Sequence, residues 1–111
     1  MKTEIYIDTV SGEKLKKELY CYDNSGIISR EYYHLHGNRH REDGPATIWY
    51  YDNGEIQGKW YYQNDKKHNK LGPAIICYNK NGEITREKFF INGIECDILQ
   101  EMVIKGSMEI I

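Results

Sequence analysis

The sequence predicts a mainly all-β protein, a single-layer antiparallel meander of repeated β-hairpins, elongated and twisted, with a short C-terminal capping helix. Three observations support this fold class. Residue types recur every 28 positions, short runs rich in β-branched and aromatic residues alternate with turn dipeptides, and a helical apolar pattern first appears after residue 97. A fixed period of this length is typical of stacked repeat units.

The repeat is clearest in two stretches, HREDGPATIWYYDNGE at 40–55 and HNKLGPAIICYNKNGE at 68–83. The period predicts one repeat domain over 1–111, with units at about 19–46, 47–74 and 75–96 and a cap over 97–111. Neighbouring strands in a chain usually pair, so consecutive hairpins should form a meander of about seven strands.

Each unit contains two predicted strands, as in Pro45–Tyr51 and Ile56–Gln63, whose residue types favour strands. The Asn53-Gly54 dipeptide between them predicts a type I′ turn. A second turn should follow the second strand, and a loop with His and Gly-Pro should lead to the next unit. The second turns are expected at Gly37-Asn38, Asn64-Asp65 and Asn92-Gly93.

Aromatic residues at the 28-residue period predict ladders across the sheet. The two expected ladders are Tyr22, Tyr50 and Tyr78, and Tyr33, Tyr61 and Phe89. Strand alternation places other aromatic residues on the opposite face, unless a β-bulge at Gly58 reverses the alternation. Exposed Trp and Tyr often anchor protein partners. The residues predicted to bind a partner are Trp49, Tyr51, Trp60 and Tyr62, extended by Tyr32 and Phe90.

The stretch CDILQEMVIKG predicts the capping helix, because its apolar residues share one helical face. Asp97 with Gln100 is similar to a capping box, and Gly106 suits the position after a helix end. Such a cap would cover the last hairpin of a stacked array.

The motifs HREDGPA, YYDNGE and WYYQND resemble the variant form of the MORN repeat over about residues 20–94. The chain departs from that pattern at Lys16–Glu18, which replace Gly-Pro-Ala, and at Cys96, which takes the His position. The resemblance implies an elongated run of β-hairpins that acts in scaffolding, protein binding or self-association. A lipid-binding role is a weaker implication, and the family offers no catalytic residues to transfer.

Composition excludes several classes of function. The formal net charge of −2, from 15 basic and 17 acidic residues, gives no electrostatic reason to expect nucleic acid or an anionic membrane as a ligand. No apolar run approaches a membrane span, and the N-terminus lacks the apolar region of a signal peptide. The odd count of three cysteines, Cys21, Cys77 and Cys96, favours reduced thiols and a cytoplasmic location.

Two polar clusters allow competing interpretations. His34, His36 and His40 could ligate zinc, but His40 recurs as His68, which favours a structural role in the loop and predicts no metal or cofactor. Basic residues in equivalent loops could bind phosphate along one edge, but interleaved acidic residues favour a solvated edge. These basic residues are Arg39, Arg41, Lys66, Lys67 and Lys70.

No catalytic motif is present, and Cys21 and Cys77, at positions taken as equivalent, suit small buried apolar sites. The sequence therefore predicts a non-catalytic module that binds another protein as a scaffold or adaptor, with homodimerisation a further expectation. One alternative is a small inhibitor from a virus or mobile element that blocks one specific host protein or nucleoprotein. The second alternative is RNA or DNA binding through the basic loops and tyrosines.

Overall fold

The computed structural model of the chain describes residues 2–9, 12–23 and 25–96, and every regular element within them is a β-strand. The prediction of an all-β antiparallel fold is therefore confirmed for this part of the chain. The predicted capping helix, with the rest of the cap over 97–111, lies outside the described residues. No helix in the described part is long and apolar enough to cross a membrane.

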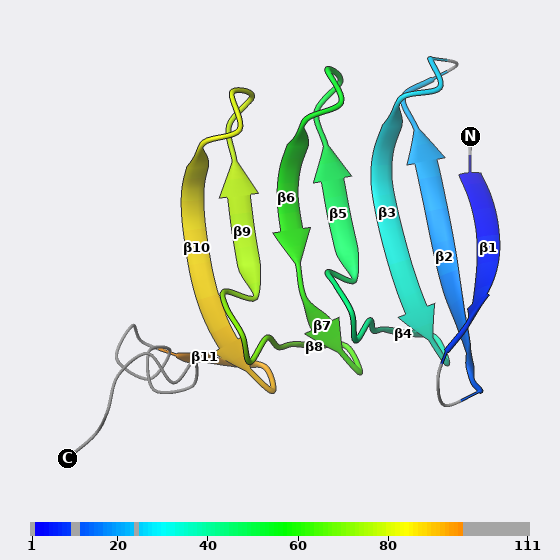
Figure 1. The fold of residues 1–111 in the computed structure, drawn as a ribbon, viewed down its shortest axis with the longest axis vertical. Helices are drawn as coiled ribbons and strands as arrows, with labels where there is room; N and C mark the ends of the chain where they lie inside the picture. The colour runs from blue at the N-terminus through cyan, green and yellow to red at the C-terminus, as the bar shows by residue number, and fades with distance from the viewer. Residues whose placement is uncertain (1, 10–11, 24, 97–111) are drawn as a thin grey trace.

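Within the described residues, nine strands form one antiparallel sheet, and the long strands follow each other in chain order (Figure 1). The order is β1-β2-β3-β5-β6-β9-β10-β11, with the short β4 paired to the end of β3 and a separate ribbon formed by β7 and β8. The bounds are β1 Lys2–Asp8, β2 Lys14–Cys21, β3 Ile28–Leu35, β4 Asn38–Arg39, β5 Thr47–Tyr50, β6 Ile56–Trp60, β7 Tyr62–Gln63, β8 Lys66–Lys67, β9 Ile75–Tyr78, β10 Ile84–Ile91 and β11 Ile94–Cys96.

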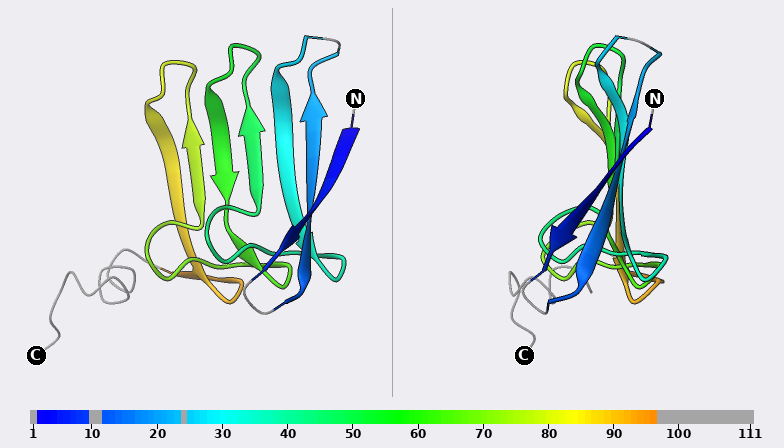
Figure 2. Two further views of the ribbon diagram at one scale, coloured as in Figure 1. Left: turned by 45° about the vertical axis from the view of Figure 1, so that its right-hand side comes forward. Right: turned by 90° about the vertical axis from the view of Figure 1, so that its right-hand side faces the viewer.

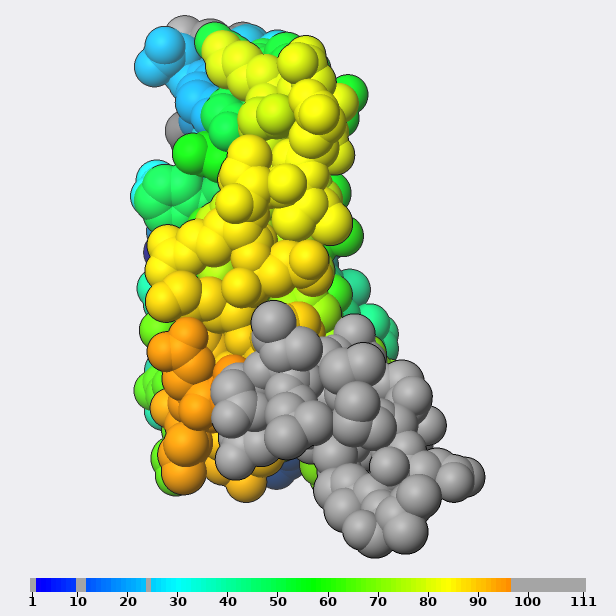
Figure 3. Space-filling model, turned by 90° about the vertical axis from the view of Figure 1, so that its left-hand side faces the viewer, coloured from blue at the N-terminus to red at the C-terminus, as the bar shows by residue number. Residues whose placement is uncertain are grey.

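The long strands make a single twisted layer. Figure 2 shows this layer from the side, with the loops at one end folded away to either side of it. Figure 3 looks onto the β10 edge and shows that the molecule is narrow in this direction. Right-handed strand twist accounts for the coiling of such a sheet.

The first turn of the second and third units is not the predicted type I′ turn. Tyr51 N–H donates to the Glu55 carbonyl at 2.8 Å and Gly54 N–H donates to the Tyr51 carbonyl at 3.0 Å. In this turn only Gly54, with φ +88°, has a positive φ. This is a tight turn closed by a glycine bulge, and the strand register shifts between Trp49 and Tyr50. The Asn-Gly dipeptide therefore supplies one left-handed residue here and not two.

The type I′ geometry occurs instead at the second turn of each unit. Two consecutive residues have positive φ there, and the residues on either side of them pair in the sheet or ribbon. The pairs are His36-Gly37, Asn64-Asp65 and Asn92-Gly93. The first of these begins one residue before the position expected from the sequence.

The turn of the first unit is one residue longer than the others. Tyr22 N–H donates to the Ile27 carbonyl, whereas Tyr51 N–H donates to the Glu55 carbonyl. The strand partners show the consequence, because Ile28, Ile56 and Ile84 pair with Cys21, Tyr50 and Tyr78 respectively.

The predicted ladder of Tyr22, Tyr50 and Tyr78 is therefore wrong at Tyr22, since Cys21 occupies the strand position equivalent to those of Tyr50 and Tyr78. Cys21 and Cys77 are likewise not equivalent. The Tyr22 hydroxyl donates to the Tyr50 carbonyl instead. In the second series, Tyr33 and Tyr61 do occupy equivalent positions, because their N–H groups donate to the carbonyls of Ala46 and Ala74 at 2.8 Å each.

The two faces of the sheet differ in how they are covered. We call the side that carries Tyr33, Ile48 and Ile76 the loop face, because the Gly-Pro loops fold onto it. Its core cluster contains Leu15, Tyr33 and Ala46, and the alanine has no exposed surface. The opposite side, which carries Tyr32, Trp49 and Trp60, is the open face.

Buried polar groups on the loop face have partners. The buried carboxylate of Glu31 accepts hydrogen bonds from the hydroxyls of Tyr50 at 3.1 Å and Tyr33 at 3.4 Å. Burial, followed by the nearby Glu31 carboxylate, raises the pKa of Tyr50 to about 12. The core of the loop face is thus packed and hydrogen-bonded, although a hollow of about 930 Å³ lies beside the Gly-Pro loops on that face.

Candidate functional site

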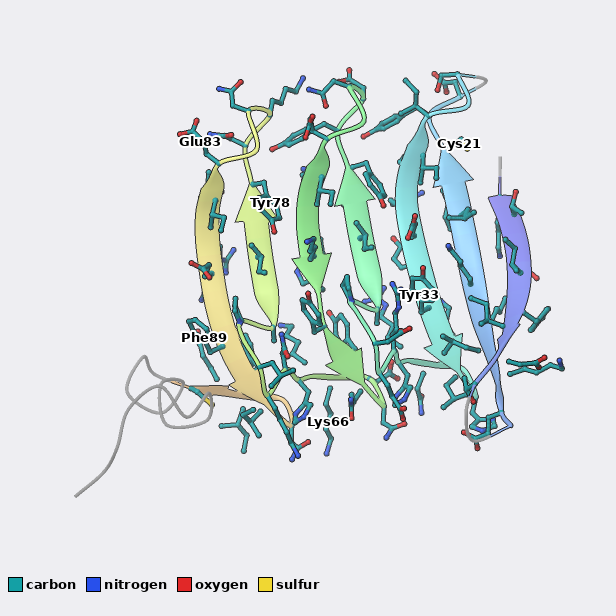
Figure 4. All side chains as sticks on the ribbon, in the orientation of Figure 1. Cys21, Tyr33, Lys66, Tyr78, Glu83 and Phe89 are labelled. Atoms are coloured by element: carbon teal, nitrogen blue, oxygen red, sulfur yellow. The ribbon has the colours of Figure 1, made fainter. Side chains whose placement is uncertain are left out.

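The open face carries a shallow hollow of about 460 Å³ over strands β5 and β6. It lies between β3, which carries Tyr33, and β9, which carries Tyr78; both residues are labelled in Figure 4. Its lining consists mainly of aromatic side chains. The lining residues are Tyr32, Arg39, Thr47, Trp49, Tyr51, Gln57, Trp60, Tyr62, Cys77, Tyr78 and Thr85.

Five of the six residues that the sequence predicts for partner binding line this hollow. They are Tyr32, Trp49, Tyr51, Trp60 and Tyr62. The sixth, Phe90, is not part of the lining and lies one unit further along, with the Lys67 ammonium 4.9 Å from its ring centroid. Sequence alternation therefore grouped the aromatic residues correctly, although whether they bind a partner stays a prediction.

Two rows of paired residues build the hollow. One row runs Arg30, Trp49, Gly58 and Cys77 across four strands, and the next runs Tyr32, Thr47, Trp60 and Ile75. Opposite residues in antiparallel strands point to the same face, so both rows lie on the open face. The register shift falls beyond Trp49, towards the turn, and so the bulge does not reverse the alternation at Gly58.

Gly58 provides the space for the Trp60 indole. A Cβ atom on Gly58 would lie 2.5 Å from Cη2 of Trp60, which is too close for any side chain. The Trp49 and Trp60 ring centroids are 6.1 Å apart at an interplanar angle of 59°. The corresponding positions 28 residues before and after Gly58 are Arg30 and Arg86. The glycine therefore makes the hollow a feature of the middle unit.

Two arginines lie over the aromatic residues of the open face. The Arg39 guanidinium is 5.4 Å from the Tyr32 ring and 5.5 Å from the Tyr62 ring. The Arg30 guanidinium is 5.8 Å from the Trp49 ring and 5.9 Å from the Tyr32 ring. Among the ion pairs of the described residues, neither arginine has a carboxylate partner within 4.0 Å. In the described part of the chain, both guanidinium groups therefore contact aromatic rings and no carboxylate.

The acidic groups on β1 and β2 of this face are already neutralised. Glu18 on β2 accepts from Lys2 Nζ at 2.7 Å and lies 3.0 Å from His34 Nε2, while Glu4 lies 3.1 Å from Lys2 Nζ. The hydrogen bond from Lys2 is the main reason that the pKa of Glu18 is lowered. The local charge at the hollow is therefore positive, although the whole chain has a net charge of −2.

Thr47 lies beneath the aromatic rings. Its side chain is 4% exposed, and its hydroxyl is the buried side-chain group without a hydrogen-bond partner in the described part of the chain. A buried hydroxyl without a partner destabilises a fold by about 1–3 kcal/mol. No sequence pattern distinguishes this residue, since threonine is an ordinary strand residue.

The structure divides the basic residues predicted to share one loop edge between the two faces. Arg39 and Lys67 lie over rings on the open face, at positions 28 residues apart. Arg41 packs 4.0 Å from the Tyr33 ring on the loop face and pairs with Asp43 at 2.9 Å. Lys70 lies with Arg41 around a separate hollow on that face, and Lys66 is exposed in β8. These five residues do not form one continuous stripe.

The loop histidines link neighbouring units. Nδ1 of His40 accepts from the Asn64 N–H at 3.1 Å, and Nδ1 of His68 accepts from the Asn92 N–H at 2.9 Å. An accepting Nδ1 places the proton of the neutral ring on Nε2. Burial is the main cause of the lowered pKa of His68, and the charge of Lys70 adds to it. This geometry agrees with the structural interpretation of these residues.

The other two histidines of the sequence cluster lie apart from this linkage. His34 Nε2 is 3.0 Å from Glu18 on the open face, and His36 Nε2 is 3.0 Å from Glu13. Among residues 2–9, 12–23 and 25–96, no three His, Cys, Asp or Glu side chains gather into a group that could hold a metal ion.

The hollow can stack a ring and attract an anion, and the buried Thr47 hydroxyl lies beneath its rings without a hydrogen-bond partner. No family model, no curated protein and no solved structure matches the chain.

Proposed function

We propose that the chain is a non-catalytic protein-binding repeat module and that the aromatic hollow on the open face is its contact site. The observation that carries this proposal is the grouping of Tyr32, Trp49, Trp60 and Tyr62 in one hollow, in which Gly58 leaves space for the Trp60 ring. Trp49 is 38% exposed, so its ring lies at the surface and would become buried when a partner binds. The resemblance to variant MORN repeats supports the same function.

Residue type also favours a protein partner. Trp, Tyr and Arg are the residues most often responsible for binding energy at protein interfaces, especially when they cluster. Here two tryptophans, four tyrosines and Arg39 share one lining. Within residues 2–9, 12–23 and 25–96 the long strands form one layer, and its open face presents these residues.

Affinity capture with the purified full chain tests the proposal. The comparison uses wild type, Trp60→Ala and a matched control, Leu71→Ala, which removes an 85% exposed apolar side chain on the loop face. A protein retained by wild type and Leu71→Ala but lost with Trp60→Ala supports the proposal. Circular dichroism must show that Trp60→Ala is folded. Capture that Trp60→Ala leaves unchanged would count against the hollow as the contact site.

The number of captured proteins separates two versions of this function. Several proteins bound through the hollow would indicate an adaptor or scaffold. One protein bound at equal stoichiometry, with loss of its activity, would indicate an inhibitor.

Self-association is a second candidate, and the edge strand β1 favours it. All seven residues of β1 are exposed, and the strand pairs on one side only, with β2. Two copies paired antiparallel about Ile5 would place Lys2 of one copy opposite Asp8 of the other. Ile5, which is 42% exposed, would face its own counterpart across the two-fold axis, and Ile7, which is 37% exposed, would lie opposite Thr3 of the other copy.

A further inference from the structure

We propose that the hollow recognises an acidic peptide segment that inserts one aromatic side chain between the tryptophans while its carboxylates meet Arg39 and Arg30. This inference rests on the proposed protein-binding function and names the chemistry of the partner. Three independent features of the open face carry it, namely ring geometry, unpaired positive charge and an unsatisfied hydroxyl.

The ring geometry favours a planar side chain. Trp49 and Trp60 are inclined at 59° with centroids 6.1 Å apart, so they form a wedge and do not pack fully against each other. An inserted ring can meet one indole face-on and the other at its edge, which are the two favoured aromatic arrangements. The hollow of about 460 Å³ has room for one aromatic side chain with part of the adjoining backbone.

The charge favours an acidic segment. Arg39 is the charged residue of the lining, and Arg30 reaches the same rings from β3. Each guanidinium has its donors free of carboxylates in the described structure, while the carboxylates of Glu4 and Glu18 are occupied by Lys2, Lys16 and His34. Guanidinium groups bind carboxylates through paired hydrogen bonds, and a ring beneath the cation fixes its plane for that contact.

A cationic segment is disfavoured for the same reason. An aromatic pocket alone would suit an ammonium group, but here two arginines already lie over these rings. A second cation would compete for the same ring faces and be repelled by both guanidinium groups. The unsatisfied Thr47 hydroxyl further favours a segment that brings polar backbone groups with its ring over a purely apolar ligand.

A nucleotide also combines a ring with an anion, but the observations favour the peptide. Single-stranded nucleic acid needs cations in a line that follows several phosphates. On this face the basic residues beyond Arg30, Lys2 and Lys16, are already paired with Glu4 and Glu18, and the chain carries a net charge of −2.

The test uses the full chain labelled with ¹⁵N and follows two indole N–H signals by nuclear magnetic resonance. The chain has two tryptophans, and both line the hollow, so these signals report on the site directly. The probe is the blocked peptide Asp-Glu-Phe-Glu-Asp. The comparison probes replace the phenylalanine by alanine, replace all four acids by lysine, or substitute a thymidine octanucleotide.

The acidic phenylalanine peptide is expected to shift both indole signals in a saturable way. The alanine and the lysine peptides should each bind at least about tenfold more weakly, a difference of about 1.4 kcal/mol. Arg39→Gln should weaken the acidic peptide about fivefold or more. Lys17→Gln is the matched control, because it removes a cation 5.4 Å from the centroid of a ring, Tyr33, that lies on the loop face and does not line the hollow. It should leave binding unchanged.

Equal binding of the lysine or alanine peptide, or unmoved indole signals at millimolar acidic peptide, would overturn this inference. In those cases a captured protein that depends on Trp60 would leave the proposed function in place. Binding of the octanucleotide in preference to every peptide would overturn both this inference and the proposed protein-binding function, and it would indicate that the hollow binds nucleic acid.

Discussion

The Trp60 indole occupies the space in which any side chain at position 58 would have to lie, because a Cβ atom on Gly58 would be 2.5 Å from Cη2 and 2.7 Å from Cζ3 of that ring. The shape of the hollow thus depends on one missing side chain. The same relationship makes the hollow easy to perturb without altering any residue that would touch a ligand.

Gly58→Ala should push the Trp60 ring out of its place and reshape the hollow. Overpacking of this kind typically destabilises a protein by about 1–3 kcal/mol, and we expect the lower end because the clash is with the far side of a ring that can turn. Urea unfolding gives the free energy, and near-ultraviolet circular dichroism reports the ring. In a Trp60→Ala background the alanine at 58 should have little further effect, and additive losses would contradict the assigned clash.

Thr47→Val should stabilise the free protein by about 1 kcal/mol, because it removes a buried hydroxyl that has no partner and keeps the shape of the side chain. Thr85→Val is the matched control. The Thr85 hydroxyl donates to the Cys77 carbonyl at 3.3 Å, so its loss should be neutral or destabilising. Both free energies come from urea unfolding. A less stable Thr47→Val would show that the hydroxyl makes a bond that this structure lacks.

Acid should weaken the fold through His68. Its pKa in the folded protein lies below the ordinary value of 6.5, so the unfolded chain takes up the proton first. The free energy of unfolding should therefore be highest above pH 6.5 and should fall as the pH drops from 6.5 towards the folded pKa. Thermal unfolding at several pH values measures this slope.

His68→Asn places an amide oxygen near the position of Nδ1 and keeps an acceptor for the Asn92 N–H. This variant should show a smaller loss of stability between neutral and mildly acidic pH than wild type. An unchanged slope would mean that other groups cause the pH dependence.

Ile5→Glu should abolish any dimer that forms through β1. In the monomer the new carboxylate would lie opposite Lys17 on β2, which is a favourable pair. In the two-fold arrangement the same carboxylate would face its own copy across the axis. Light scattering after size-exclusion chromatography gives the mass. Ile84→Glu, at an exposed position on β10, is the control. A wild-type protein that is monomeric at high concentration, or a dimer that survives Ile5→Glu, would refute pairing through β1.

The repeat and its composition were enough to predict the antiparallel sheet and the grouping of Tyr32, Trp49 and Trp60 on one face. Both follow from a 28-residue period and from strand alternation, which are local properties. The first turns were mispredicted because Asn-Gly is compatible with two hairpin geometries. A register shift between paired strands decides between them, and a single segment does not reveal that shift.

Other features could not be predicted from the sequence, because they depend on how the strands pair in the folded protein. The extra residue in the turn from Tyr22 to Ile27 displaces the first strand by one position, so counting by 28 aligned Tyr22 with the wrong partners. Arg39 was assigned to a loop edge because nothing local shows that it turns back over Tyr32 and Tyr62. The signal that could have located the hollow was Gly58, a glycine where the neighbouring units have arginine.

The imidazole bridges from His40 to Asn64 and from His68 to Asn92 join each segment to the one that follows it, and they recur with the same spacing. The free energy of unfolding of such a repeat protein is approximately the sum of one contribution from each segment and one from each junction between neighbouring segments. Adding a whole segment would therefore add one segment contribution and one junction contribution to the stability, and it would leave the residues of the hollow unchanged. Cutting the chain within a segment would remove a junction and so would also destabilise the neighbouring segment.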